Sequence, residues 1–392
     1  MQPDFGALDD RLATLDVDAY LIDADGDDSN QRYLSGFDAP DPFLSCYRPE
    51  ALSVLVSGLE YGRAKAESRA DRVVRPADYD HQALLEEYGR PEATRRVRAR
   101  FLADVGVESA AVPERFPIGT ADALRERDIE IVVDTEDVIQ AIRATKTEAE
   151  REHIRAAQRA NEAAMAAAES LLSAATPDAE GTLVLDGEAL TSERVKHDIE
   201  ATLLEYGCGL DETIVAGGSQ GADPHDRGSG PLAANEPIVI DIFPRDKTTK
   251  YHADMTRTFC VGEPTDTARE RYELTEDALA AALEAVEPGA TGDDVHAAAC
   301  EVYEEAGLPT FRTDPETEIG FIHSTGHGVG LDVHELPRLH PGGGELEAGH
   351  VITVEPGLYD PAVGGIRLED IVVVTDDGFE NLTEYPIEFV VD

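Results

Sequence analysis

A repeat in the last two thirds of this sequence constrains its fold more than any other feature. Residues 191–207 and 291–307 each start with threonine and end with glycine, and they lie 100 residues apart. Each predicts a helix, with threonine at the N-cap and glycine at the C-terminal end. After each helix, a loop leads to two apolar strands that carry acids. The sequence therefore predicts two equivalent halves, each built from a helix and a pair of strands.

Four acids occupy equivalent places in the two strand pairs. In the first half, PIVID ends at Asp241 and ADMTRTF carries Asp254, and in the second half VITVE ends at Glu355 and IRLEDIVVV carries Glu369. The offsets between the halves are 114 and 115 residues. Because an unpaired charge in an apolar strand is costly, a pseudo-twofold arrangement that gathers these carboxylates at the centre of the sheet predicts bound cations.

The stretch HSTGHGVGLDVHE, residues 323–335, adds histidines to these acids. It holds three of the eleven histidines, and Asp332 and Glu335 lie in the same stretch. Its closely spaced glycines disfavour a helix and predict a loop running into a strand. Four carboxylates and one imidazole suit two hard or borderline divalent ions, which would activate a bridging water and clamp a carbonyl oxygen. The alternative is that the acids form buried salt bridges with Arg257 and Arg367.

The first third of the chain alternates predicted strands with predicted helices, a pattern typical of an α/β layer. NQRYLSGF, residues 30–37, predicts a turn followed by a short strand, and Thr120 is the predicted cap of a helix over residues 120–128. The sequence shows no glycine-rich phosphate loop after the first strand, so dinucleotide binding is not supported. The predicted strands are residues 19–22, 52–56, 109–113 and 129–134, and the other predicted helices are residues 81–88 and 94–104.

A long helix predicted to start after Thr147 and to end near Leu172 separates this part from the repeat. A chain of 392 residues is also too long for one compact core. We therefore expect two domains, residues 1–144 and residues 145–392.

The charge of the chain restricts its partners and its surroundings. The sequence contains 81 acidic and 33 basic residues, which gives a net charge of −48. The acids are spread along the whole chain, which is typical of a halophilic protein working in concentrated salt. Nucleic acid is excluded as an expected partner because there is no basic footprint. We also expect no membrane span and no signal peptide, and four unpatterned cysteines favour the reducing cytoplasm.

Several segments resemble, in order, the signature segments of the creatinase/aminopeptidase P/prolidase family, the M24 metallopeptidases with the pita-bread fold. They are DIFPRDKTTKYHADMTRTF, HSTGHGVGLDVHE, ITVEPG and GGIRLEDIVVVT, and RYLSGF and ATKTEAEREHIRAA resemble the family's N-terminal domain and interdomain helix. The resemblance implies an α+β fold. In it, a pita-bread catalytic domain with an internal pseudo-twofold repeat follows a smaller α/β creatinase-like N-terminal domain.

The resemblance also implies which residues bind metal. The five implied ligands of two divalent ions are Asp241, Asp254, His327, Glu355 and Glu369. The expected ions are Mn²⁺ or Co²⁺ first, and Zn²⁺ or Fe²⁺ next.

The resemblance also implies roles in catalysis and substrate binding for residues at matching positions. Glu355 would also shuttle the proton of the bridging water, and His334 would steady the oxyanion of the scissile carbonyl. His323 matches a histidine near the prolyl residue, His225 matches one that flanks the pocket, and Arg367 matches an arginine that orients carboxylates or substrate.

The activity implied is hydrolysis of the peptide bond before proline by metal-activated water, in a homodimer acting on proline-containing peptides. Xaa-Pro aminopeptidase and Xaa-Pro dipeptidase both remain open. The sequence departs from the family at Ile242 and Phe243, where a glycine usually follows the first ligand by two residues, and in a longer segment between Asp241 and Asp254. Alternatives are a metal-free creatinase-type C–N hydrolase, a non-catalytic peptide-binding member of the fold, and a phosphatase-like metal enzyme.

Overall fold

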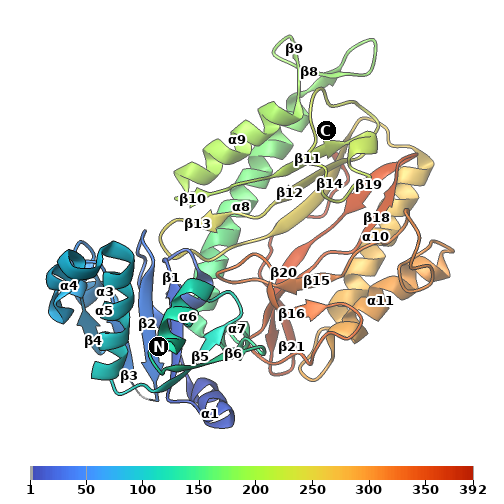
Figure 1. Ribbon diagram of the computed structural model, residues 1–392. Coiled ribbons are helices and arrows are strands. Elements are labelled where there is room, and N and C mark those ends of the chain that lie inside the picture. The colour runs from blue at the N-terminus through green and yellow to red at the C-terminus, as the bar shows by residue number, and fades with distance from the viewer. Residues whose placement is uncertain (1–2, 50, 392) are drawn as a thin grey trace. The chain divides into compact units, whose positions relative to one another are not determined.

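The structure is a computed structural model that describes residues 3–49 and 51–391. The chain forms two compact units, one ending at Arg143 and the other beginning at Ala144, and both combine helices with sheets (Figure 1). No helix among the described residues has the length and apolar character needed to cross a membrane. All four cysteines are buried and free.

The first unit is built on one six-stranded sheet. Its strands are β1 (Ala19–Ala24), β2 (Phe43–Arg48), β3 (Ala51–Leu55), β4 (Arg72–Val74), β5 (Ser109–Pro113) and β6 (Glu130–Asp134). They lie in the order β4-β3-β2-β1-β5-β6, and the pairs β1–β2 and β2–β3 are antiparallel whereas the other pairs are parallel. Its helices are α1 (Gly6–Leu15), α2 (Ser29–Ser35), α3 (Tyr61–Glu67), η1 (Pro76–Tyr79), α4 (His81–Tyr88), α5 (Arg90–Asp104), α6 (Ile118–Arg125) and α7 (Val138–Ala144), the last of which reaches the unit boundary.

Residues 30–37 belong mainly to helix α2, so the predicted turn and strand are wrong here. Asp28 caps this helix, because its Oδ1 accepts a hydrogen bond from the backbone N–H of Gln31 at 2.8 Å. Gly36, at a φ of 66°, ends it in the left-handed conformation that glycine adopts without strain. These two end signals outweigh the apolar character of the segment between them.

The predicted cap at Thr120 is also wrong. Helix α6 begins at Ile118, so Thr120 lies inside its first turn. The hydroxyl of Thr120 instead donates a hydrogen bond to Oδ2 of Asp23 at 2.7 Å. Threonine is a favoured capping residue near a helix start, but this side chain makes a buried hydrogen bond to a residue of β1 instead.

The second unit begins with α8 (Glu148–Ala174), for which Thr147 and Glu150 form a reciprocal capping box. The later helices are α9 (Ser192–Glu205), η2 (Gly218–Gln220), α10 (Asp266–Glu284) and α11 (Gly292–Glu305). The strands are β7 (Thr176–Pro177), β8 (Leu183–Leu185), β9 (Glu188–Ala189), β10 (Cys208–Gly209), β11 (Ile214–Gly217), β12 (Ile238–Ile242), β13 (Arg245–Asp246), β14 (Met255–Val261), β15 (Gly326–Gly328), β16 (Glu335–Leu339), β17 (Val351–Val354), β18 (Gly357–Asp360), β19 (Gly364–Arg367), β20 (Asp370–Thr375), β21 (Gly378–Asn381) and β22 (Val390–Val391).

The predicted internal repeat is present in this unit. Thr191 and Thr291 cap α9 and α11, and Gly207 and Gly307, which follow these helices, both have a φ of 78°. The order α9–β11–β12–β14 in the first half matches α11–β15–β17–β20 in the second, and neighbouring strands within each series are antiparallel. The two central sheets have the strand orders β11-β12-β14-β22 and β16-β15-β17-β20-β21.

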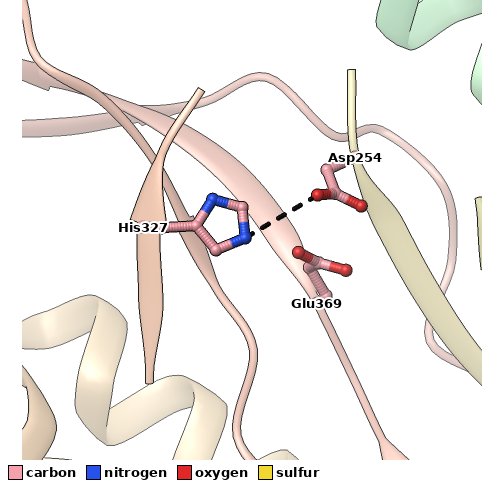
Figure 2. Close-up of side chains that lie close together, drawn as sticks. All are labelled: Asp254, His327 and Glu369. Atoms are coloured by element: carbon pink, nitrogen blue, oxygen red, sulfur yellow. Dashed lines mark ion pairs between the residues drawn. The ribbon is translucent and has the colours of Figure 1, made fainter. Parts of the chain in front are cut away.

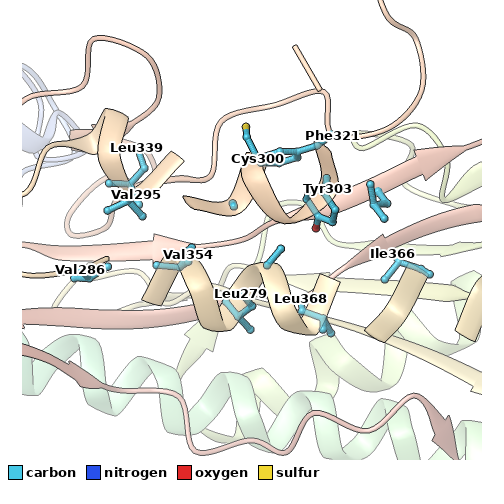
Figure 3. Close-up of a cluster of buried hydrophobic side chains, with 14 of the residues drawn as sticks. Leu279, Val286, Val295, Cys300, Tyr303, Phe321, Leu339, Val354, Ile366 and Leu368 are labelled. Atoms are coloured by element: carbon cyan, nitrogen blue, oxygen red, sulfur yellow. The ribbon is translucent and has the colours of Figure 1, made fainter. Parts of the chain in front are cut away.

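Each half has its own apolar core between its helices and its sheet. In the second half, Leu279 on α10, Tyr303 on α11 and Val354 on β17 pack in one buried cluster (Figure 3). Val372 on β20 belongs to the same cluster. Each fully buried large apolar side chain contributes about 1.5–3 kcal/mol to folding. These cores hold the strands whose ends carry the predicted acids.

Candidate metal centre

Three side chains of the second unit converge in a candidate metal site. They are Asp254, His327 and Glu369, all buried, and each offers a ligand atom within 4.8 Å of the others (Figure 2). Asp254 directly precedes β14, His327 is the middle residue of β15, and Glu369 lies between β19 and β20. The stretch IRLEDIVVV, predicted as one strand, is interrupted at this acid. Asp254 and Glu369, 115 residues apart in the sequence, therefore meet at one place.

Glu355 follows β17 and approaches the same histidine. Its Oε1 lies 3.3 Å from Nε2 of His327, compared with 3.9 Å for Oδ2 of Asp254. The backbone N–H of Glu355 donates to the carbonyl of Thr325 at 2.7 Å, and the hydroxyl of Thr353 donates to its Oε1 at 3.3 Å. These bonds fix both the backbone and the carboxylate of Glu355.

Two glycines allow β15 to carry His327 into the site. A Cβ atom on Gly326 would lie 2.1 Å from the carbonyl oxygen of Thr353, and one on Gly328 would lie 2.0 Å from that of Leu336. Both distances are far inside van der Waals contact, so a larger residue at either position would displace the strand. The glycine density of this stretch therefore reflects close backbone packing around the histidine.

Asp241 lies on β12 and is held by Arg367. Its Oδ2 accepts a hydrogen bond from Nη2 of the arginine at 2.5 Å. Its Oδ1 is buried and has no hydrogen-bond partner among the described residues. Burial raises the pKa of Asp241 despite the neighbouring arginine. A buried carboxylate oxygen without a partner is the kind of group that a metal ion satisfies.

The alternative of purely structural salt bridges accounts for only one of the four acids. Arg257 pairs with Asp370 at 2.8 Å and contacts Glu369 only through its backbone carbonyl. Within residues 3–49 and 51–391, neither Asp254 nor the Glu369 carboxylate has a lysine or arginine partner.

The carboxylates of this site repel one another. Burial and the charges of Glu369 and Asp241 raise the pKa of Asp254 well above its ordinary value. Burial and the charges of Glu355 and Asp241 do the same to the pKa of Glu369. Burial also acts against ionisation of Glu355, but the hydrogen bond and charge of His327 outweigh it and lower that pKa to about 2. Divalent cations would neutralise this concentration of negative charge.

The donor set fits such cations. It combines carboxylate oxygens with one imidazole nitrogen, a mixture suited to borderline divalent ions such as Mn²⁺, Co²⁺, Fe²⁺ and Zn²⁺. The site is also ordered by a further contact, because the hydroxyl of Thr256 donates to Oε2 of Glu369 at 2.8 Å. Hydrogen bonds of this kind orient metal ligands in proteins.

The histidines predicted to contact the substrate lie in different surroundings. His334 is exposed, and its ring packs edge-on against His327 with 4.2 Å between ring centroids. His225 is exposed in the loop after η2. The carbonyl of Pro224, the residue before it, accepts a hydrogen bond from Nη1 of Arg367 at 3.4 Å, which brings this loop to the site.

His323 is connected to Arg367 through Tyr359, a residue that the sequence did not single out. The hydroxyl of Tyr359 lies 2.8 Å from Nη1 of the arginine and 3.0 Å from Nε2 of the histidine. Burial lowers the pKa of His323 to about 4, so the ring is neutral near pH 7. Nδ1 therefore donates to the carbonyl of Ser324 at 2.7 Å, and Nε2 accepts from the tyrosine. The only sequence signal for Tyr359 was its place four residues after Glu355.

Models of known protein families match both parts of the chain. The model of metallopeptidase family M24 matches residues 152–376, and the model of the creatinase/prolidase N-terminal domain matches residues 6–145. The probable dipeptidase PepE of Mycobacterium tuberculosis is 39% identical over 204 residues, which are 51% of this chain and 52% of that relative. The chain therefore aligns with about half the length of this curated relative.

Two solved structures match almost end to end. The prolidase from Pyrococcus horikoshii OT3 has 27% identity and a TM-score of 0.78, with 98% of both chains covered. The X-Pro aminopeptidase from Thermotoga maritima has 26% identity and a TM-score of 0.79, with 97% of this chain and 100% of that chain covered. The predicted fold, a pita-bread domain preceded by a creatinase-like domain, is confirmed by these matches. Because the family model spans more than half of the sequence, this chain belongs to metallopeptidase family M24.

Proposed function

We propose that this chain is a metal-dependent peptidase that cleaves the peptide bond before proline. The observation that carries the proposal is the buried cluster of Asp254, His327 and Glu369, with Glu355 beside it. So many buried carboxylates are costly unless cations neutralise them. The substrate class is supported by the likeness to a prolidase and to an X-Pro aminopeptidase.

Two divalent ions would be held by five side chains. We propose Mn²⁺ or Co²⁺ first, and Zn²⁺ or Fe²⁺ next, because the donors are mostly carboxylates with one imidazole. Bound ions of this kind supply Lewis acidity to a carbonyl oxygen and lower the pKa of water. The proposed ligands are Asp241, Asp254, His327, Glu355 and Glu369.

Glu355 is the proposed proton shuttle. Its carboxylate would accept a proton from the attacking water while the water oxygen bonds to the carbonyl carbon. It would then deliver that proton to the prolyl nitrogen as the C–N bond breaks. The support for this role is its fixed position, with hydrogen bonds at both its backbone N–H and its carboxylate.

The other site residues would bind and orient the peptide. His334 would donate a hydrogen bond to the scissile carbonyl oxygen, where negative charge develops. Both ring nitrogens of His323 are already bonded, so we propose that it offers the side of its ring to the prolyl residue. His225 would flank the pocket, and Arg367 would orient the carboxylate of Asp241.

Proline explains why a dedicated enzyme is needed. The prolyl nitrogen carries no N–H, so a peptidase that recognises that hydrogen cannot use this bond. The broader description, Xaa-Pro aminopeptidase or Xaa-Pro dipeptidase, is retained because relatives of both names match at similar identity.

We propose residues 1–144 as the N-terminal domain and residues 145–392 as the catalytic domain. We further propose a homodimer in the cytoplasm of a cell with concentrated internal salt, where a net charge of −48 is screened. Proline-containing peptides are the proposed substrates, and neither nucleic acid nor a membrane is a proposed partner.

One experiment tests the proposed function. The protein, purified in concentrated KCl, is analysed for bound metal and assayed on Gly-Pro, on Arg-Pro-Pro and, as a control, on Gly-Gly. We expect cleavage before proline that a chelator abolishes and added Mn²⁺ restores, and little cleavage of Gly-Gly. Bound metal without Xaa-Pro cleavage would contradict the substrate, and full activity in the chelator would contradict the metal. The ratio of Gly-Pro to Arg-Pro-Pro cleavage separates a dipeptidase from an aminopeptidase.

A further inference from the structure

We propose that a buried ion pair between Lys146 and Glu335 positions the turn that carries His334. Nζ of the lysine lies 2.6 Å from Oε1 of the glutamate, and both side chains are only 1% exposed. The inference rests on the proposed function, in which His334 contacts the scissile carbonyl. Lys146 is one of five lysines in a chain with 81 acids, so its burial beside one particular acid calls for a specific explanation.

The carboxylate of Glu335 supports the inside of the turn formed by residues 329–334. Glu335 starts β16, directly after His334, and pairs with Gly328 on β15. A Cβ atom on Gly330 would lie 2.2 Å from its Oε1, so the turn closes directly onto this carboxylate. The backbone N–H of Asp332 also lies 3.5 Å from Oε2.

The same turn is bonded to the segment that leads to a proposed metal ligand. The backbone N–H of His252, two residues before Asp254, donates to the carbonyl of Gly330 at 2.8 Å. The turn is therefore held from outside by this segment and from inside by the carboxylate of Glu335.

Lys146 is itself a fixed anchor. Its backbone N–H donates to the carbonyl of Gly349 at 2.8 Å, and it directly precedes Thr147, the cap of α8. Because the lysine backbone is held at the start of a long helix, its side chain can hold Glu335 in place.

His334 depends on this support because its own side chain is weakly held. Among the described residues, the ring of His334 contacts the ring of His327 but makes no hydrogen bond. Its position is therefore set mainly by the backbone of the turn. Lys146 and Glu335 are positioning residues in this account, and they act on substrate only through His334.

The test uses the full-length, metal-loaded protein and Lys146→Met. We expect kcat for Gly-Pro to fall by about 10- to 100-fold, since small misplacements of a reacting group have effects of this size. KM should stay within about threefold, because the interaction lost is made mainly in the transition state. In a His334→Ala background the same change should lower kcat by less than about twofold, because both changes act through one group. Lys247→Met, at an exposed lysine of the same unit, is the matched control and should leave kcat unchanged.

A second variant keeps the test open if Lys146→Met does not fold. Lys146→Met combined with Glu335→Gln removes both charges, so no buried carboxylate is left without its partner. We expect this variant to fold and to have a kcat as low as that expected for Lys146→Met. Compared with the wild type, its amide hydrogen exchange should be faster in residues 329–334 but not in β12. Wild-type kcat in the double variant, or an equal loss of kcat with and without His334, would overturn the inference. If the wild-type protein fails to cleave Gly-Pro, the proposed function fails. In that case the exchange experiment still tests this inference, because an unchanged amide exchange rate of residues 329–334 in the double variant, relative to the wild type, would overturn it.

Discussion

The Nε2 atom of His327 lies 3.3 Å from Oε1 of Glu355. The two residues are 28 positions apart in the sequence, and they meet because β15 and β17 are antiparallel neighbours. The contact joins the nitrogen donor of the candidate metal centre to the carboxylate that we assign to proton transfer.

Changing Glu355 to alanine should abolish turnover of Gly-Pro. The change removes the proposed proton shuttle and one proposed metal ligand together, and general acid–base catalysis alone contributes about 10²–10⁴-fold. Steady-state assays of the folded variant measure the effect, with Glu347→Ala at an exposed position as the control. A Glu355→Ala enzyme with wild-type turnover would refute this role.

Changing His334 to alanine should lower kcat by about 10²-fold or more, the usual effect of removing an oxyanion donor. Metal content should not change, because His334 contacts His327 only through its ring. The measurement is kcat for Gly-Pro together with metal analysis, and His197→Ala, at an exposed position on α9, is the control. Loss of metal with unchanged turnover per bound metal would show that His334 helps to retain the ions and does not stabilise the oxyanion.

Without metal, the protein should lose stability as the pH rises. Burial and neighbouring acids raise the pKa values of Asp254 and Glu369 in the folded state. Their contribution to stability is therefore complete below the unfolded pKa of about 4, and it is lost as the pH rises through the folded pKa values. Each tenfold difference in proton affinity between the folded and unfolded states corresponds to about 1.4 kcal/mol. Divalent ions bind the ionised carboxylates and should reverse this loss.

Urea unfolding between pH 5 and pH 8, with chelator or with Mn²⁺, measures this effect. Because the acidic surface adds its own pH dependence, the informative quantity is the difference from Asp254→Asn, which removes one of the two ionising groups. We expect the metal-free wild type to lose stability relative to this variant as the pH rises. A difference that does not change with pH would contradict the proposed electrostatics.

The duplicated scaffold could be predicted from the sequence because the residues that delimit its helices act locally. Thr191 and Thr291 cap helices at equivalent places, and Gly207 and Gly307 adopt the same left-handed conformation after them. Cap preferences act over one helical turn, so they are visible in a single sequence. Local signals also misled in two places: residues 30–37 belong mainly to a helix that Asp28 and Gly36 delimit, and Thr120 lies inside α6 instead of capping it.

Contacts between distant segments were not predictable in the same way. Tyr359 is fully buried like a core residue, yet its hydroxyl links Arg367 to His323. The pair of Lys146 and Glu335, 189 positions apart, is likewise invisible without the fold that joins the start of α8 to β16. Such contacts depend on three-dimensional packing, for which a single chain carries no periodic or spacing signal.

The acidic composition predicts that the protein needs salt. With a net charge of −48, self-repulsion destabilises the compact state at low ionic strength, and about 1 M salt shortens the Debye length to about 3 Å. The urea midpoint should rise with KCl concentration, whereas sucrose at matched osmolality should not replace the salt. Full folding and full activity in salt-free buffer would show that the acids are not an adaptation to salt.

The central claim is that side chains from both halves of the repeat converge around a pair of cations. Anomalous diffraction from crystals grown with Mn²⁺ tests it most directly. We predict two anomalous peaks, both enclosed by Asp241, Asp254, His327, Glu355 and Glu369. Crystals of Asp254→Asn should show weaker or missing peaks at the same place. A well-occupied Mn²⁺ elsewhere, with these five side chains unliganded, would contradict the account.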